Sequence, residues 1–131
     1  MDGLYDLTFS LLAGDPTLQA LLGGSASDRK VYPVEDLGRV APPAIAVAVV
    51  AGPSDVAFGV DRPTLVLTIA SAVSATEVVA IASRVEALLN RKRLAGNGRL
   101  VHLCLKDNDT DDFDPDAREF VRDVRYRLIA Q

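Results

Sequence analysis

The segment Ala44–Val50 places the tightest limit on what this chain can fold into. Alanines alternate there with Ile45, Val47 and Val49, so an extended strand would be small on one face and bulky on the other. A strand that is apolar on both faces belongs in the interior of a sheet, and alanines allow a helix to pack closely. The sequence therefore predicts a sheet with helices packed on it.

Further segments carry the alternation that is typical of β-strands. The predicted strands and their core-facing residues are Thr64–Ala70 with Leu65, Leu67 and Ile69, Leu100–Leu105 with Val101, Leu103 and Leu105, and Arg118–Ile129 with Phe120, Val124, Tyr126 and Leu128. Val31–Val34 predicts a short strand at an edge of the sheet, because Pro33 has no N–H to donate. Between the two central strands, Ala51–Pro63 is predicted to form a long hairpin whose tip projects beyond the domain.

Two helices are predicted near the N-terminus. Residues 3–13 place leucines at near-helical spacing. Asp15 and Pro16 begin a second helix, because aspartate caps a helix N-terminus and proline suits the first helical position. Gly23 and Gly24 end it, since glycine readily adopts the left-handed conformation at a helix C-terminus.

The main helix is predicted over Ser74–Leu89. Ser74 and Glu77 form the capping-box pattern, in which each side chain accepts from the other residue's backbone N–H. The stripe predicted to lie on the sheet is Val78, Ile81, Val85, Leu88 and Leu89. The resulting order αα-β-β-β-α-β-β predicts an α+β fold, a mainly antiparallel sheet of four to five strands with helices packed on one side. Residues 1–131 are expected to form a single domain.

Composition narrows the classes of function. The net charge is −4, with 18 acidic and 14 basic side chains, so the chain has no general attraction to nucleic acid. One cysteine excludes an intrachain disulfide. The longest apolar run, Ala41–Gly52, contains two prolines and is too short to span a bilayer. Without a signal-peptide pattern, we expect synthesis and folding in a cytoplasm.

His102 and Cys104 are the first candidates for chemistry. They are predicted to share one face of a strand, opposite Val101 and Leu103. Two neighbours on one strand supply neither a third metal ligand nor the partner that a nucleophile needs, and no other cysteine or histidine exists. We therefore interpret His102 as a surface or satisfied histidine and Cys104 as a small packed side chain.

The acidic run 107–112 resembles the opening of a calcium-binding loop. However, Asp112 stands where that loop needs glycine, and Arg118 stands where it needs glutamate. A solvated acidic loop over Lys106–Asp116 is the favoured interpretation, with adventitious binding of a divalent cation as the alternative. Other carboxylates, such as Asp36, Asp61 and Asp123, have no spacing that indicates a catalytic site. We predict no catalytic residue, no cofactor and no metal.

Three groups of motifs together resemble a known family. They are Leu4-Tyr5-Asp6-Leu7 with Gly14-Asp15-Pro16-Thr17-Leu18 and Leu21-Leu22-Gly23-Gly24; the strand Pro43–Val50, a long hairpin and Ile69-Ala70-Ser71; and the helix Thr76–Leu89, Leu100–Leu105, an Asp-rich segment and Arg125-Tyr126-Arg127-Leu128. This order is similar to that of tail-completion or tail-terminator proteins of tailed bacteriophages and prophages.

The resemblance implies a structural virion protein of the phage tail or neck, made in the host cytoplasm, with an α+β fold and no chemistry. It implies a homo-hexameric ring that caps the head-proximal end of the tail tube, stops tube polymerisation and offers the head-tail joining surface. The implied partners are other copies, the tail-tube protein and the head-tail connector or head-completion protein. The resemblance also implies that DNA passes through the lumen as cargo and that no membrane is involved. The alternatives are another neck ring, such as a head-closure or adaptor protein, and a small bacterial ligand-binding or regulatory domain.

Two charged blocks and one apolar hairpin are the candidate interface. The acidic block is Asp107, Asp109, Asp111, Asp112 and Asp114, the basic block is Arg91, Lys92, Arg93 and Arg99, and the hairpin carries Val56, Phe58 and Val60. A head-to-tail ring needs two different, complementary patches. Our hypotheses are that unlike blocks meet between neighbours, or that the acidic block faces the lumen and repels passing DNA. For the hairpin, the alternative is that Phe58 folds back onto its own core.

Overall fold

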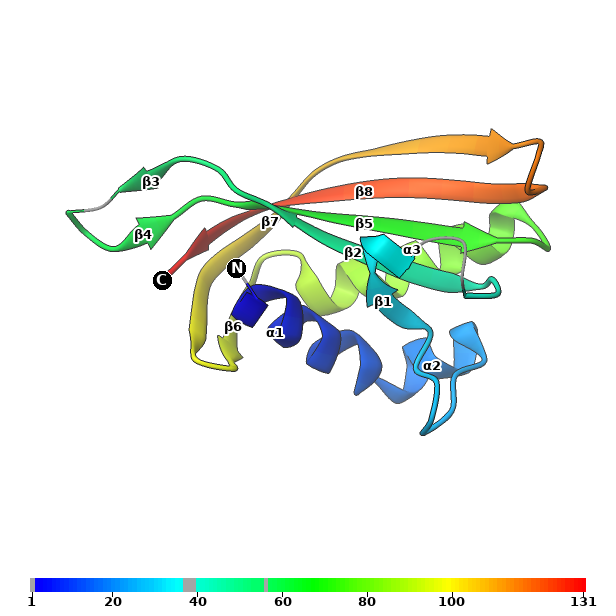
Figure 1. Ribbon diagram of the computed structural model, residues 1–131, viewed down its shortest axis with the longest axis horizontal. Coiled ribbons are helices and arrows are strands. Elements are labelled where there is room, and N and C mark those ends of the chain that lie inside the picture. Colours follow the sequence, from blue (N-terminus) through cyan, green and yellow to red (C-terminus); the bar gives the residue numbers. More distant parts are fainter. Residues whose placement is uncertain (1, 37–39, 56) are drawn as a thin grey trace.

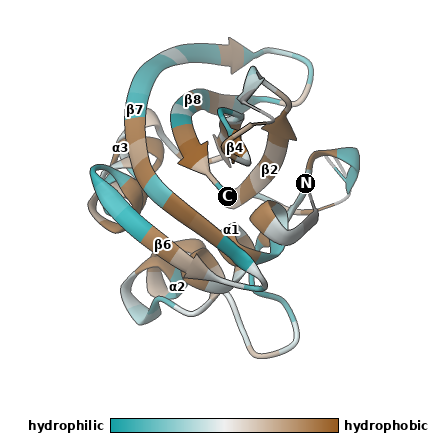
Figure 2. Ribbon diagram, turned by 90° about the vertical axis from the view of Figure 1, so that its left-hand side faces the viewer, coloured by the Kyte–Doolittle hydropathy of each residue, from teal (hydrophilic) through white to brown (hydrophobic). Residues whose placement is uncertain are grey.

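One curled, mainly antiparallel sheet is the framework of the computed structural model, which describes residues 2–36, 40–55 and 57–131 (Figures 1 and 2). Its strands are β1 (Val31–Pro33), β2 (Ala44–Val50), β3 (Ser54–Asp55), β4 (Val60–Asp61), β5 (Thr64–Ser71), β6 (Lys92–Gly96), β7 (Arg99–Asp114) and β8 (Glu119–Ala130). The order β1-β2-β5-β8-β4-β3 is extended by β7, which pairs with β8, and by β6, which pairs with β7. The α+β class is confirmed, but eight strands exceed the predicted four to five because β3, β4 and β6 add short ladders.

The three α-helices among the described residues lie on one side of the sheet (Figure 1). They are α1 (Asp2–Ala13), α2 (Pro16–Leu22) and α3 (Ala75–Leu89); the chain also has a short 3-10 helix, η1 (Val34–Asp36). Helix α3 packs on β5 and β8, and the predicted stripe buries Val78, Ile81, Val85 and Leu89. No helix within the described ranges is long and apolar enough to cross a membrane.

The predicted caps form, with one difference. The Asp15 side chain accepts from the backbone N–H of Leu18, and Gly23 ends α2 in the left-handed conformation. Ser74 accepts from the N–H of Glu77, as a capping box requires. The carboxylate of Glu77 does not return to Ser74; it accepts from the hydroxyl of Ser71 at 2.6 Å. Ser71 in turn accepts from the N–H of Ser74, so a buried serine completes the cap.

The two faces of β2 are covered differently from the prediction. Ile45 and Val47 join the large core with the helices, whereas Ala44 and Ala46 pack with Tyr32 of the edge strand β1. The helices therefore pack on the bulky face of β2, and the alanines make room for an aromatic ring. The predicted edge position of β1 is confirmed, and β1 pairs with β2 in parallel.

The prediction of which β7 side chains face the core is wrong after Val101. A register shift between Val101 and Leu103 interrupts the alternation. Val101 and Cys104 are buried, three positions apart, while Leu103 is half-buried and Leu105 is 40% exposed. One extra residue in the ladder thus turns Cys104 into the core and moves two leucines out of it.

The acidic segment is a strand and not the predicted loop. The β7–β8 ladder continues without interruption from Asn108, opposite Arg125, to Asp114, opposite Glu119. Only residues 115–118 form the turn. In Figure 2 the half of β7 beside β6 is largely hydrophobic and the other half is largely hydrophilic. The result is a long hairpin whose acidic end extends away from β6 (Figure 1).

The predicted projecting hairpin is confirmed. Strands β3 and β4 pair with each other, and the hairpin extends beyond the rest of the sheet on the side opposite to the β7–β8 turn (Figure 1). We call residues 53–55 and 57–62 the arm. Phe58 lies in the turn of the arm, Val60 is half-buried in β4, and Val56 falls outside the described residues.

Candidate functional site

The structure separates His102 from Cys104. His102 is exposed, and its Nε2 lies 2.7 Å from Oε1 of Gln131. Cys104 is fully buried, and burial raises the pKa of its thiol to about 12. A thiol with so high a pKa is almost entirely protonated at neutral pH and is a poor nucleophile. Cys104 is therefore the packed side chain that the sequence predicted, but it does not share a face with His102.

The remaining carboxylate candidates lie apart from one another, and Asp61 and Asp123 accept hydrogen bonds from different residues. Asp61 in β4 accepts from the Ser54 hydroxyl, and Asp123 in β8 accepts from the Thr68 hydroxyl, each at 2.8 Å. Asp61 pairs with Ala130, which is seven residues along β8 from Asp123, or roughly 23 Å of strand. Asp36 lies in η1. Within the described ranges, no three histidine, cysteine or carboxylate side chains lie close enough together to hold a metal ion.

Three aspartates of the acidic block are held by cations of the same chain. Asp107 pairs with Arg127 at 2.9 Å. Asp109 pairs with Lys106 at 2.9 Å, and Asp111 receives two hydrogen bonds from the Arg122 guanidinium, at 2.6 and 3.0 Å. These oxygens are already paired with cations, and the segment is part of the β7–β8 ladder and not a loop.

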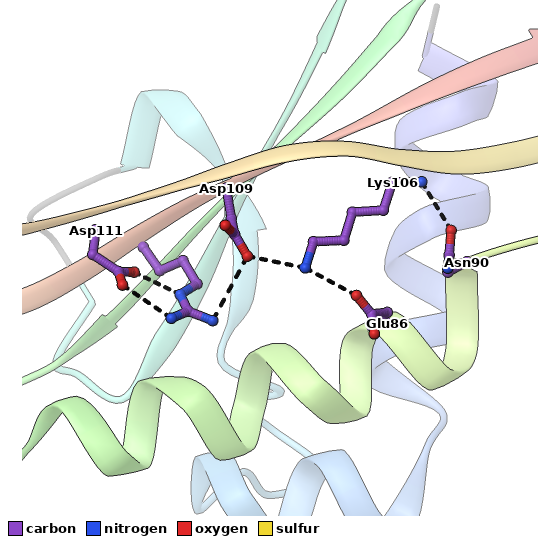
Figure 3. A network of polar contacts seen from close by, with 6 residues as sticks. Glu86, Asn90, Lys106, Asp109 and Asp111 are labelled. Atoms are coloured by element: carbon purple, nitrogen blue, oxygen red, sulfur yellow. Dashed lines mark hydrogen bonds and ion pairs between the residues drawn. The ribbon is translucent and has the colours of Figure 1, made fainter.

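The pairs continue into a network that reaches α3 (Figure 3). Lys106 bridges Asp109 to Glu86 of α3, with its Nζ 2.9 Å from an oxygen of each. Both carboxylates raise the pKa of Lys106, and the hydrogen bonds from Arg122 lower the pKa of Asp111. The backbone N–H of Lys106 also donates to the side chain of Asn90, at the C-terminal end of α3. The acidic strand is thereby fixed over the helix.

Two further charged groups lie far apart along β7. Residues 112–119 carry four acidic side chains and one basic side chain, a net charge of −3; we call them the acidic tip. Residues 91–93 carry three cations, all exposed, at the start of β6; we call them the basic edge. No ion pair among the described residues involves either group. Lys92 pairs with Cys104, so ten residues of β7, roughly 33 Å, separate the basic edge from Asp114.

Arg99 does not belong to the basic edge. It lies at the β6–β7 turn, and its guanidinium is 3.5 Å from the carboxylate of Asp61 in the arm. The aliphatic part of the Arg99 side chain packs so closely against Gly3 that a β-carbon at Gly3 would lie only 2.7 Å from it. Arg99 therefore connects the arm to the start of α1.

Phe58 is not covered by its own chain. Its side chain is 74% exposed at the end of the arm, so the alternative that it folds back onto the core is wrong. A cleft of about 470 Å³ lies at the base of the arm, between Pro53, Thr64, Leu105 and Ile129. No sequence pattern indicated this cleft, because its walls combine the base of the arm with residues 103–105 and 127–129, which are distant along the chain.

The fold and the sequence resemble known proteins. A chain in the structure titled as the virion of a native gene transfer agent particle superposes with a TM-score of 0.77 at 17% sequence identity, over 97% of this chain and 93% of that chain. No curated protein matches the sequence significantly. Residues 8–131 match the family model described as tail completion protein gp17, and this span is nearly the whole chain. The chain therefore belongs to the gp17 family of tail completion proteins, a structural family of bacteriophage tails.

Proposed function

We propose that this protein is a tail terminator: a homo-hexameric ring that caps the head-proximal end of the tail tube, stops tube polymerisation and provides the head-tail joining surface. The arm is the observation that carries the proposal. A projecting hairpin with a 74% exposed phenylalanine, together with the exposed Leu105 and Ile129 of the cleft at its base, supports a role in assembly, since grouped exposed apolar side chains mark contact surfaces. Membership of the tail completion family supports a place in the virion, and the similarity to a chain of a virion particle agrees with it.

Tube growth in the presence of the protein tests this function directly. Purified chain is added to polymerising tail-tube protein of the same phage at a molar excess over tube ends. We expect the tubes to stop elongating and to carry one ring at one end in negative-stain images. Light scattering of the released caps is expected to give six times the mass of one chain. Tubes that elongate at an unchanged rate would contradict the terminator function and would favour another position in the neck.

Within the ring, we place the acidic tip at the lumen. The tip lies at the opposite end of the molecule from the arm (Figure 1), so a ring joined through the arms leaves the tip outside the contact. Its net charge of −3 has no internal ion pair and would repel passing DNA. The basic edge remains exposed for an acidic partner. The other hypothesis, in which tip and edge of neighbouring copies meet, predicts a different result in the next experiment.

Reversing charge at the tip separates these two arrangements. Asp112→Lys with Asp116→Lys is the suitable pair, because Asp114 accepts from the N–H groups of Asp116 and Ala117 and holds the turn. We expect rings of unchanged mass and a fall of at least about tenfold in infectivity, since a cationic lumen retains DNA. The matched control is Lys92→Glu with Arg93→Glu. If each double variant alone fails to form rings but an equimolar mixture of the two restores them, then tip and edge meet between neighbours and the lumen placement is wrong.

A further inference from the structure

The cleft at the base of the arm is an unfilled apolar site on the face of the sheet away from α3. Leu103 and Ile129 are cross-strand neighbours there, and Leu105 lies next along β7, opposite Arg127. Ile129 is 37% exposed and Leu105 is 40% exposed, which is high for aliphatic side chains that share one cleft. The register shift in β7 produces this surface, because it turns two leucines away from the core.

Several contacts hold the base of the arm. The backbone N–H of Arg62 donates to the carbonyl of Pro53 at 2.9 Å, and Ser54 donates to Asp61 at 2.8 Å. Gly52 lies so close to the backbone of Arg62 that no side chain fits between them. Arg99 holds Asp61 from the body of the molecule. These contacts fix the base of the arm before any partner binds, which lowers the entropy lost on binding.

We propose that the arm of one copy of this chain inserts Phe58 into the cleft of the next copy. This inference rests on the proposed ring, and it names the contact that closes the ring. Phe58 cannot enter the cleft of its own chain, because Pro53 and Arg62 line that cleft and the arm carries Phe58 about four to five residues, roughly 15 Å, away from them. A knob and a hole on different parts of one molecule make a heterologous contact, which generates a ring when the rotation closes.

Charge complementarity supports a second copy as the occupant. Residues 54–61 include two aspartates and no basic residue, and the side chain of Asp61 is 43% exposed beside Arg99. The cleft is bordered by Arg62 and by Arg127, whose side chain is 72% exposed although it also pairs with Asp107. Exposed ion pairs of this kind are weak, so these charges can also attract a neighbouring copy. An apolar centre with a charged rim is the usual composition of a protein contact, and aromatic side chains that fill a pocket contribute most of the binding free energy.

Cysteine cross-linking tests the contact. Phe58→Cys chains are mixed with Leu105→Cys chains, assembled on tail-tube ends and oxidised. The native Cys104 can stay, because it is fully buried and its thiol is unreactive. We expect a disulfide-linked dimer from the mixture and none from either variant alone. The matched control is Val73→Cys, which is as exposed as Phe58, at 74%, but lies between β5 and α3; mixed with Leu105→Cys it is expected to give no dimer.

A second pair of variants measures the strength of the contact. Phe58→Asp is expected to raise the protein concentration for half-maximal assembly at least about tenfold, whereas Val73→Asp is expected to leave it unchanged. Rings that form without the 58–105 cross-link would overturn the arm contact and leave the terminator function standing. A cross-link in chains that never form rings would sustain the contact and overturn the ring. A Phe58→Cys chain that links to the tube protein and not to Leu105→Cys would also overturn the contact.

Discussion

A Cys104→Asp substitution is expected to lower the free energy of unfolding by about 3–5 kcal/mol, because it places a carboxyl group in the core without a partner. Leu105→Asp is expected to lower it by less than about 1 kcal/mol. Cys104 is fully buried in the large core, whereas Leu105 is 40% exposed. Urea unfolding followed by far-ultraviolet circular dichroism measures both changes at pH 7.

The two substitutions control each other. They introduce the same residue at adjacent positions of β7, so effects on net charge and on strand propensity are nearly equal. Strict alternation from Val101 would bury Leu103 and Leu105 and would expose Cys104. Leu105→Asp would then lower the free energy of unfolding more than Cys104→Asp. The opposite result, a tolerated Cys104→Asp and a damaging Leu105→Asp, would therefore mean that β7 has no register shift. The cleft in which Phe58 is proposed to bind would then not exist.

The parts of the fold that follow from local chemistry were predictable. The strands β2, β5 and β8 were predicted from their alternation, and all three are present close to the predicted bounds. The ends of α2 and the start of α3 were set by Asp15, Gly23 and Ser74, whose capping groups act within a few residues. These signals are short-range, so they do not depend on how the rest of the chain is arranged.

The acidic half of β7 was not predictable from its own residues. Aspartate and asparagine are rare in strands, and a run of them favours a loop. The run is extended because β8 supplies cations across the ladder: Asp111 lies opposite Arg122, and Arg127 reaches Asp107. Cross-strand pairs of opposite charge offset the poor intrinsic preference. The available signal was that acidic and basic residues lie at matching distances from a turn centred between Asp116 and Ala117: Asp111 is five residues before Asp116, and Arg122 is five residues after Ala117.

The candidate site also has one part that was predictable from the sequence and another that was not. The arm was predictable, because Val56, Phe58 and Val60 alternate in a segment between two strands. The acidic block stays a prediction as an interface; within it, Asp107, Asp109 and Asp111 form ion pairs, whereas none is formed by Asp112 or Asp114 with the described residues. The cleft was not predictable: Pro53, Leu105 and Ile129 meet through the curl of the sheet, and the outward turn of Leu105 depends on a register shift that no residue pattern announced.

An ion pair that no sequence pattern indicated connects α2 to α3. Asp15 caps α2 and also receives two hydrogen bonds from the Arg84 guanidinium of α3, each at 2.8 Å. The two residues are 69 positions apart, so only the folded chain brings them together. The side chain of Asp15 is 11% exposed, which limits competition from water for these hydrogen bonds. Asp15→Ala is expected to lower the free energy of unfolding at pH 7 by about 2 kcal/mol, because it removes the cap and leaves Arg84 unpaired.

Asp15→Asn separates the two roles through its dependence on pH. Asparagine caps a helix as well as aspartate does, so this variant keeps the cap and loses the charge. The Arg84 hydrogen bonds lower the pKa of Asp15 in the folded chain, so the pair contributes fully above the unfolded pKa of about 4 and is lost as the pH falls through the folded pKa. Urea unfolding between pH 7 and pH 2.5 is therefore expected to show a wild-type advantage over Asp15→Asn at pH 7 that disappears in acid. Asp111, whose pKa is also lowered, titrates in both proteins and cancels in the difference. A difference that stays constant across this range would show that the ion pair does not stabilise the packing of α2 against α3.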